Sequence, residues 1–195
     1  MSTVLVTGFG PYGVTPVNPA QLNADAVRAV DEVGPDLVIM LGEYGGRSML
    51  TVERLAQNLN DCARYGLADT AGVVLDGEPT APDGPVAYHA TLPIKAMVLA
   101  MRDAGIPPDI SDAAGTFVCN HLMYGMLHHI ATHDLPIRAG WIHLPYLPEV
   151  AALDRNLGEP SMSVDTAAAG VMAGIEAALH HDVDVGTPVP SRLLI

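Results

Sequence analysis

The chain has 195 residues, of which 49% are hydrophobic and 16% are charged, a balance that fits a compact globular domain and excludes a disordered chain. Its formal net charge of -13 argues against nucleic acid and anionic membranes as partners. We therefore expect a single domain over residues 1–195 that binds neither nucleic acid nor membranes.

The N-terminal part of the chain alternates between strand and helix patterns. Val4–Thr7 is a short apolar strand that runs into the glycine-rich loop at residues 8–13. Residues 19–30 have the apolar spacing of a helix. Residues 36–41 form a continuous apolar run, which is typical of a strand buried on both faces of a parallel sheet. A second glycine-rich loop, G-E-Y-G-G-R at residues 42–47, follows that strand.

The central part of the chain has a less regular pattern. Residues 51–59 fit either a strand or a helix, and residues 69–81 are rich in turn residues. A short strand is expected at residues 86–89 and another at residues 109–113. Between them, residues 92–104 have the pattern of an amphipathic helix that is closed by a glycine and two prolines.

The last third again reads as helix, strand and helix. A helix is expected over residues 117–133 with Thr116 as its cap, followed by a strand at residues 138–144. Residues 163–181 form a long alanine-rich helix. The tail, residues 182–195, contains proline and glycine, and we expect it to be mobile.

Strands that alternate with helices predict an α/β fold, a three-layer sandwich with an open, mostly parallel twisted sheet flanked by helices. Active sites in such sheets gather beyond the carboxyl ends of the strands. The loops at residues 8–13, 42–47 and 114–120, together with His143, are expected at that edge.

The N-terminal sequence M-S-T-V-L-V-T-G-F-G has no basic segment and no small-residue cleavage site of a signal peptide. No apolar run reaches the roughly 18 residues that span a bilayer. The chain has two cysteines, Cys62 and Cys119, which we expect to be reduced thiols. These features predict a cytoplasmic protein.

A cysteine and a histidine stand at the ends of expected core elements. Cys119 falls in the first turn of a helix, where unpaired N–H groups and the helix dipole stabilise a thiolate. His143 is the candidate base, and Glu53 or Glu43 is the candidate carboxylate that orients it; Glu149 follows a proline-rich turn and fits less well. The other interpretation is a buried thiol that acts as a small hydrophobe and a structural histidine.

Two further patterns suggest other chemistry. Histidines gather on the helix at residues 117–133, and the spacing of four between His129 and His133 is compatible with zinc, but no acidic or cysteine ligand joins them at motif spacing. The G-F-G-P-Y-G loop lacks the lysine of a P-loop and the full dinucleotide pattern. We therefore predict no metal and no cofactor.

Several sequence blocks resemble a known enzyme family. The blocks V-L-V-T-G-F-G-P-Y-G-V-T-P-V-N-P, V-E-R-L-A-Q-N-L-N-D, G-T-F-V-C-N-H-L-M-Y-G and G-W-I-H-L-P-Y-L-P-E, in this order between Val4 and Glu149, are similar to pyrrolidone-carboxylate peptidases (pyroglutamyl peptidase I). The resemblance implies a metal-independent cysteine peptidase with a Glu–Cys–His triad that removes an N-terminal pyroglutamyl residue from small peptides. Because family members commonly self-associate, it also implies a homo-oligomer.

The resemblance assigns the catalytic roles residue by residue. Cys119 matches the nucleophile in G-T-F-V-C-N, and His143 matches the base in the I-H-x-P block. Glu53 matches the acid of the triad, in a block written T-V-E-R here and T-P-E-R in many relatives. Arg64 matches an arginine that helps to stabilise the oxyanion, although the alignment slips by one residue at this point.

The resemblance also implies a pocket for the flat, neutral pyroglutamyl ring. Its apolar walls match Phe9, Tyr12, Phe117 and Val118, and Asn18 matches a position near the ring. Core packing is the alternative role for Phe117, and turn chemistry before a proline is the alternative for Asn18.

Two departures from the family pattern affect the pocket. Glu43 stands where relatives often have glutamine or a small apolar residue, and a carboxylate accepts a hydrogen bond from the lactam N–H but donates one only when protonated. Between Asn18 and Asp36 relatives carry a longer segment, with a further strand and part of a helix. The alternatives are therefore an impaired relative that binds lactam or acylated ligands, or an amide or lactam hydrolase of altered specificity.

Overall fold

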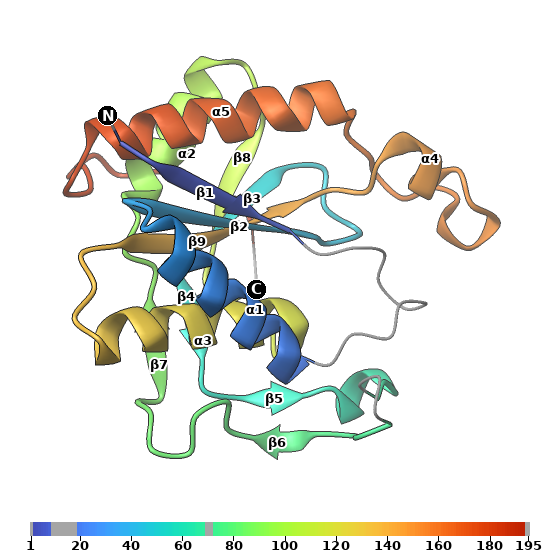
Figure 1. The fold of residues 1–195 in the computed structure, drawn as a ribbon. Helices are drawn as coiled ribbons and strands as arrows, with labels where there is room; N and C mark the ends of the chain where they lie inside the picture. Colours follow the sequence, from blue (N-terminus) through green and yellow to red (C-terminus); the bar gives the residue numbers. More distant parts are fainter. Residues whose placement is uncertain (1, 9–18, 69–71, 194–195) are drawn as a thin grey trace. The chain divides into compact units, whose positions relative to one another are not determined.

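The computed structural model describes residues 2–8, 19–68 and 72–193 (Figure 1). Within these ranges no helix has both the length and the apolar character that crossing a membrane requires. The helices are α1 (Pro19–Val33), α2 (Ile94–Asp103), α3 (Val118–Thr132), α4 (Pro148–Ala151) and α5 (Val164–His180), with 3-10 turns η1 (Ala63–Tyr65) and η2 (Asp154–Asn156). The strands are β1 (Val4–Thr7), β2 (Leu37–Glu43), β3 (Leu50–Glu53), β4 (Leu55–Gln57), β5 (Asn60–Asp61), β6 (Asp76–Glu78), β7 (Ala87–His89), β8 (Pro108–Ser111) and β9 (Arg138–Leu144).

The main sheet has the strand order β1–β2–β9–β3–β8. β1 runs parallel to β2, β3 runs parallel to β8, and β3 runs antiparallel to β9. At one end of β2 and β9, Arg138 N–H donates to Asp36 O, and at the other end Tyr44 N–H donates to Leu144 O. Because the residue numbers rise in the same direction on both strands, β2 and β9 are parallel. The predicted α/β class, with a mostly parallel sheet flanked by helices, is confirmed.

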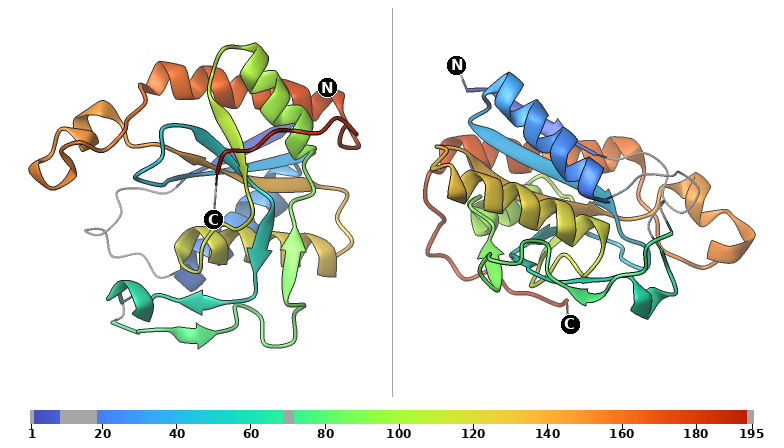
Figure 2. Two further views of the ribbon diagram at one scale, coloured as in Figure 1. Left: turned by 180° about the vertical axis from the view of Figure 1, so that it is seen from behind. Right: turned by 60° about the horizontal axis from the view of Figure 1, so that its bottom comes forward.

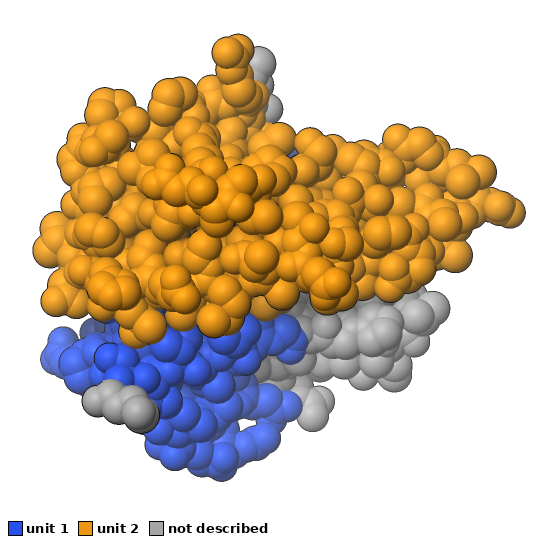
Figure 3. Space-filling model, turned by 90° about the horizontal axis from the view of Figure 1, so that it is seen from above, with its two compact units in different colours: residues 1–40, 54–91, 113–141 blue, residues 41–53, 92–112, 142–195 orange. Residues whose placement is uncertain are grey.

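Contacts divide the described chain into two compact units, coloured separately in Figure 3. Unit 1 comprises residues 1–40, 54–91 and 113–141, and unit 2 comprises residues 41–53, 92–112 and 142–195. Each unit takes three separate stretches of the sequence, so no single linker divides them. One domain over residues 1–195 stays a prediction.

In unit 1, α1 and α3 pack against each other, and their apolar side chains share a core with β2 and the start of β9. Trp141, the one tryptophan of the sequence, is 1% exposed in this core. Because aromatic residues are scarce, methionine and aliphatic side chains fill most of the remaining volume: Val30, Val38, Met40, Leu122, Met123, Met126, Leu127 and Ile130.

In unit 2, α5 packs closely on α2, as the ribbon views show (Figure 2). Gly174 of α5 allows this approach to α2, and Gly170 allows a close approach to β3 and to the loop after α2. A Cβ added at Gly170 would overlap the side chains of Leu50 and Ile106, and one added at Gly174 would lie 2.5 Å from the Cε atom of Met101. Larger residues at either position would therefore force the helix away from its neighbours.

The structure decides two local expectations. Residues 51–59, which fitted strand or helix, form β3 and β4, and β4 pairs with β7 outside the main sheet. The prediction that Thr116 caps α3 is wrong: Phe117 occupies the cap position without a side-chain bond, and the Thr116 hydroxyl donates to Asp61 O at 3.5 Å. Thr116 therefore ties the loop before α3 to β5.

The C-terminal tail is anchored in unit 2 up to Leu193. The Asp184 carboxylate accepts hydrogen bonds of 3.0–3.1 Å from the first backbone N–H groups of α2. Arg102 donates to Pro190 O at 2.8 Å, and Asp109 accepts bonds from the last described residues of the tail. Mobility of residues 182–195 stays a prediction, and these bonds argue against it for the described part.

Candidate active site

Glu53 and His143 are brought together by the pairing of β3 with β9 in unit 2. Thr51 lies directly opposite His143 in this antiparallel pair, and Glu53 follows two residues later on the same face of β3. The His143 Nδ1 atom lies 2.7 Å from Glu53 Oε1. Their side chains are 1% and 0% exposed, respectively. If Glu53 is ionised, its carboxylate only accepts hydrogen bonds, and Nδ1–H is then the donor in this pair.

The loop between β2 and β3 adds a cation to this pair. Arg47 Nη1 donates to Thr51 Oγ1 at 2.7 Å and to Glu53 Oε1 at 3.3 Å. The Thr51 hydroxyl in turn donates to the same Glu53 oxygen at 3.3 Å. Among the described residues, the other oxygen of Glu53, Oε2, has no hydrogen-bond partner. The charge of Glu53 is therefore stabilised mainly at Oε1.

Tyr44 covers both the arginine and the imidazole. The Arg47 guanidinium lies 3.9 Å from the centre of the Tyr44 ring, a cation–π contact. The same ring meets His143 edge to face, with 5.3 Å between ring centres. Gly45 is required for this loop, because a Cβ at that position would overlap the ring of Tyr146. The glycine at position 45 thus lets the loop lie against the ring of Tyr146.

Cys119 is held in unit 1 as the second residue of α3. Its neighbour Asn120 is completely buried; the side-chain amide donates to Gln57 O at 2.8 Å and to Leu59 O at 3.0 Å, and accepts from Gln57 N–H at 2.7 Å. These bonds fix the start of α3 against β4. The thiol is thereby placed at the helix end where backbone N–H groups stabilise an anion.

The second cysteine has a structural position. Cys62 is 1% exposed; its sulfur accepts from Leu75 N–H at 3.1 Å and donates to Leu75 O at 3.6 Å. Neither Cys62 nor Cys119 forms a disulfide, as predicted. Of the two thiols, Cys119 has the greater exposure.

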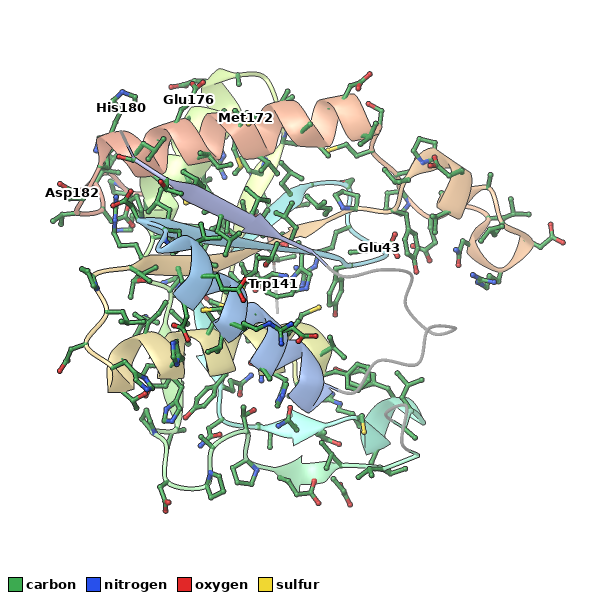
Figure 4. The ribbon with its side chains drawn as sticks, in the orientation of Figure 1. Glu43, Trp141, Met172, Glu176, His180 and Asp182 are labelled. Atoms are coloured by element: carbon green, nitrogen blue, oxygen red, sulfur yellow. The ribbon has the colours of Figure 1, made fainter. Side chains whose placement is uncertain are left out.

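The predicted pocket residues lie in different environments. Phe117 is partly buried against the core of unit 1, and Val118 belongs to that core with 7% exposure. Glu43 is exposed at the end of β2 in unit 2 (Figure 4). The predicted positions Phe9, Tyr12 and Asn18 lie outside the described residues. The pocket assignments therefore stay predictions.

Arg64, the predicted oxyanion helper, is an exposed residue of η1 in unit 1. Its guanidinium lies 5.3 Å from the centre of the Tyr65 ring, and its backbone N–H donates to Asp61 Oδ1 at 3.2 Å. Its role in catalysis stays a prediction.

Three residues of the site were not predicted from the sequence: Arg47, Thr51 and Tyr44. Thr51 had a usable signal, since it stands two residues before Glu53 and so shares its face on a strand. Arg47 gave a weaker one, an arginine at the end of a glycine-rich loop. Its contact with Glu53 depends on how that loop folds back, which spacing does not encode.

The histidines of α3 have other partners. His129 Nε2 lies 3.3 Å from Asp31 Oδ1, and His133 Nδ1 bonds to His129 O at 2.9 Å. Within residues 2–8, 19–68 and 72–193, no group of three histidine, cysteine or acidic residues is arranged to hold a metal ion.

The model of the pyroglutamyl peptidase family matches residues 23–181 of this chain. The chain belongs to this family. Pyrrolidone-carboxylate peptidases of Mycobacterium marinum and Mycobacterium tuberculosis are 68% and 66% identical to it. Each alignment is 222 positions long and covers the whole of both chains. Its similarity to these cysteine-type omega peptidases bears out the resemblance inferred from the sequence blocks.

Solved structures of the family share the fold. Pyroglutamyl peptidase I from Bacillus amyloliquefaciens has a TM-score of 0.85 and 35% identity, covering 96% of this chain and all of the other. The pyrrolidone carboxyl peptidase from Thermococcus litoralis has a TM-score of 0.85 and 30% identity, covering 97% of this chain and all of the other.

The comparison with the mycobacterial relatives also reveals a difference in length. The alignment has 222 positions and includes all 195 residues of this chain, so at 27 positions the relative has a residue and this chain has none. The relatives are therefore longer, as predicted. The location of the missing segment between Asn18 and Asp36 stays a prediction.

Proposed function

We propose that this pyroglutamyl peptidase hydrolyses the amide bond between an N-terminal pyroglutamyl residue and the next residue of a small peptide, with Cys119 as nucleophile, His143 as acid and base, and Glu53 as the orienting carboxylate. The observation that carries the proposal is the buried 2.7 Å bond between Glu53 Oε1 and His143 Nδ1. Membership of the family supports the substrate class.

When Glu53 is ionised, that bond gives His143 the tautomer that the chemistry needs. With Nδ1–H donated to the carboxylate, the lone pair of a neutral imidazole lies on Nε2, where it can accept a proton from a thiol or from water. The carboxylate then stabilises the imidazolium that forms. Since Glu53 is fully buried, solvent does not weaken this interaction.

The reaction proceeds in two acyl transfers. The Cys119 thiolate attacks the carbonyl carbon of the pyroglutamyl residue, and the C–N bond breaks as His143 gives its proton to the departing amine. A thioester remains. Water then attacks the thioester while His143 accepts a proton, which releases pyroglutamate and the thiolate. Return of that proton from the imidazolium to the thiolate restores the thiol and the neutral imidazole.

Substrate recognition is assigned by the same proposal. Phe9, Tyr12, Phe117 and Val118 form apolar walls for the ring, with Asn18 near it. Backbone N–H groups at the start of α3, with Arg64, stabilise the oxyanion. These contacts suit a small neutral lactam, which offers one donor and one acceptor.

The test is a panel of fluorogenic amides. The protein is expected to hydrolyse the pyroglutamyl amide with a kcat/KM at least about 100-fold above that for the matched prolyl and glutamyl amides, because only the lactam satisfies the polar groups of the pocket. Addition of a chelator is expected to leave the rate unchanged, and a thiol-alkylating reagent is expected to abolish it. Preference for another amide, or inhibition by the chelator, would contradict the proposal.

The shorter chain favours one alternative, a relative that binds lactam or acylated ligands with little turnover. This alternative is based on the 27 alignment positions at which the mycobacterial relatives have a residue and this chain has none. Binding of pyroglutamate in calorimetry together with absent hydrolysis of the fluorogenic amide would favour this alternative.

Glu43 is expected to change substrate preference. Although this residue has an exposed surface, burial of part of its carboxyl raises its pKa above the ordinary value of 4.5, so protonation begins at higher pH than for a fully solvated glutamate. Only the protonated form donates to the lactam oxygen. Glu43→Gln, a permanent donor, is therefore expected to lower KM for the pyroglutamyl amide about threefold to tenfold at neutral pH.

The difference in KM between the wild type and Glu43→Gln should shrink as the pH falls toward the raised pKa of Glu43, because the native side chain then becomes a donor as well. The measurement is KM for pyroglutamyl and related amides from mildly acidic to neutral pH. Equal values for both proteins at every pH would show that Glu43 does not contact the ring.

The cellular setting is part of the proposal. We propose a cytoplasmic enzyme that self-associates, as the resemblance to its family implies. The net charge of -13 supports the absence of nucleic acid and anionic membranes among its partners. Sedimentation of the purified protein at several concentrations tests its self-association.

A further inference from the structure

Arg47 and His143 bind the same oxygen of Glu53. The guanidinium Nη1 lies 3.3 Å from Glu53 Oε1, and the imidazole Nδ1 lies 2.7 Å from it. The Arg47 side chain is 14% exposed and that of Glu53 is 0% exposed, so solvent screens this ion pair little. All three residues belong to unit 2, and this part of the site is complete within that unit.

A buried carboxylate beside a neutral imidazole has two proton arrangements. If Glu53 is ionised, it accepts the proton of His143 Nδ1, and Nε2 is the basic atom. If Glu53 takes up a proton to avoid a buried charge, it donates to Nδ1 instead, and the imidazole carries its proton on Nε2. The second arrangement leaves the imidazole without a basic Nε2 and removes its function as a base.

Arg47 favours the first arrangement. Its charge is permanent, whereas the charge of His143 appears only during part of the reaction cycle. Glu53 Oε2 has no hydrogen-bond partner among the described residues, so the contacts of Oε1 carry the stabilisation of the charge. Thr51 bridges the two groups by accepting from Arg47 and donating to Glu53 Oε1.

Tyr44 fixes the arginine in this position. The Arg47 guanidinium lies 3.9 Å from the centre of the Tyr44 ring. The same ring contacts the imidazole of His143 edge to face. The loop that carries Tyr44 and Arg47 is therefore packed on the Glu53–His143 pair rather than extended into solvent.

We propose that Arg47 is a positioning residue of the peptidase: it keeps Glu53 ionised and thereby holds His143 in the tautomer with the proton on Nδ1. The expected effect of Arg47 on the rate rests on the proposed function, whereas its effect on the tautomer of His143 does not depend on the substrate. Arg47 acts through Glu53 and takes no part in bond making or breaking.

The kinetic test compares two arginines of unit 2. Arg47→Met is expected to lower kcat about 10- to 100-fold with KM changed less than about threefold, as is typical when a group that orients a functional histidine is lost. Arg102→Met is the matched control, since Arg102 also lies beside a buried carboxylate, 3.8 Å from Asp109 Oδ1, but in the tail anchor. It is expected to lower stability and leave kcat within about twofold.

The spectroscopic test reads the tautomer directly. Nitrogen NMR of the imidazole, with His143→Gln used to assign its signals, is expected to show the Nδ1–H form in the wild type and in Arg102→Met. Arg47→Met is expected to gain the Nε2–H form, and Arg47→Lys, which retains the charge but not the planar fork, is expected to lie between them.

Each outcome decides the inference. A fall in kcat together with the gain of the Nε2–H form in Arg47→Met supports it, and an unchanged tautomer or an equal fall in Arg102→Met overturns it. If Arg47→Met does not fold, Thr51→Val and Arg47→Lys supply the same comparison. A wild type that is inactive but has the Nδ1–H form overturns the proposed function alone, because the tautomer of the variants still tests Arg47.

Discussion

Cys119→Ser is expected to lower kcat/KM for the pyroglutamyl amide by about 10⁴-fold or more, whereas Cys62→Ser is expected to stay within about twofold of the wild type. The helix end at Cys119 stabilises a thiolate, but a serine hydroxyl stays protonated at neutral pH even there and attacks amides poorly. Rates from the purified variants, measured beside the wild type, check this difference.

The two cysteines form a matched pair for this experiment. Both belong to unit 1 and both are reduced, but Cys62 is buried with its sulfur bonded to the backbone of Leu75, which a serine hydroxyl can also bond. An effect of the Cys119 change on folding rather than on chemistry would appear as a lower melting temperature. A Cys119→Ser protein that retains a tenth of the wild-type rate would contradict a thiol mechanism.

Much of the fold could be predicted because its elements carry local signals. The continuous apolar run at residues 36–41 predicted β2, the amphipathic pattern of residues 92–104 predicted α2, and the alanine-rich composition of residues 163–181 predicted α5. Strand β6 could not be predicted, since its residues Asp76–Glu78 are all exposed and lack alternation. It exists because β5 offers a partner, a contact that no local pattern reveals.

The division of residues 51–59 into β3 and β4 also depends on partner strands that are distant in the sequence. The two strands are separated by Arg54 alone, yet β3 pairs with β8 and β9 in the main sheet and β4 pairs with β7. Local propensity cannot tell one strand from two when the partners are distant in sequence.

The candidate site was predicted where residue type alone carries information. Cysteine, histidine and a carboxylate are the groups that thiol acyl transfer requires, and the resemblance selected Glu53 among the carboxylates. The structure adds the bond from Glu53 to His143 and the cation at Arg47. Arg47 was missed because its role follows from loop geometry.

Asp109→Asn is expected to reduce the free energy of unfolding by about 2–4 kcal/mol at neutral pH and to release the tail. Asp109 is 2% exposed, and its Oδ2 atom accepts from the backbone N–H groups of Arg192 and Leu193 at 2.8 and 3.0 Å, while Oδ1 accepts from Ile110 N–H at 2.8 Å. Asparagine replaces one acceptor oxygen with a donor that faces another donor, and it removes the charge beside Arg102.

The same carboxylate makes the anchor sensitive to acid. Burial by itself raises the pKa of Asp109, but hydrogen bonds from Arg192, Ile110, Ser191 and Leu193 outweigh burial and bring this pKa below the ordinary value of 3.8. A carboxyl group whose pKa is lower in the folded state stabilises the protein above the unfolded value, and this stabilisation is lost as the pH falls through the folded value. The difference in stability between the wild type and Asp109→Asn should therefore be constant above about pH 5 and should shrink below pH 3.8.

Urea unfolding at several pH values measures this difference, and hydrogen exchange of residues 184–193 reports the release of the tail. Asp103→Asn is the matched control, because it makes the same chemical change at an exposed position of α2 and is expected to alter stability by less than about 0.5 kcal/mol. If Asp109→Asn were as stable as Asp103→Asn, or if its deficit persisted unchanged well below pH 3.8, the ionised carboxylate would not be what anchors the tail. A stability loss without faster exchange in the tail would instead place the effect of Asp109 in β8 itself.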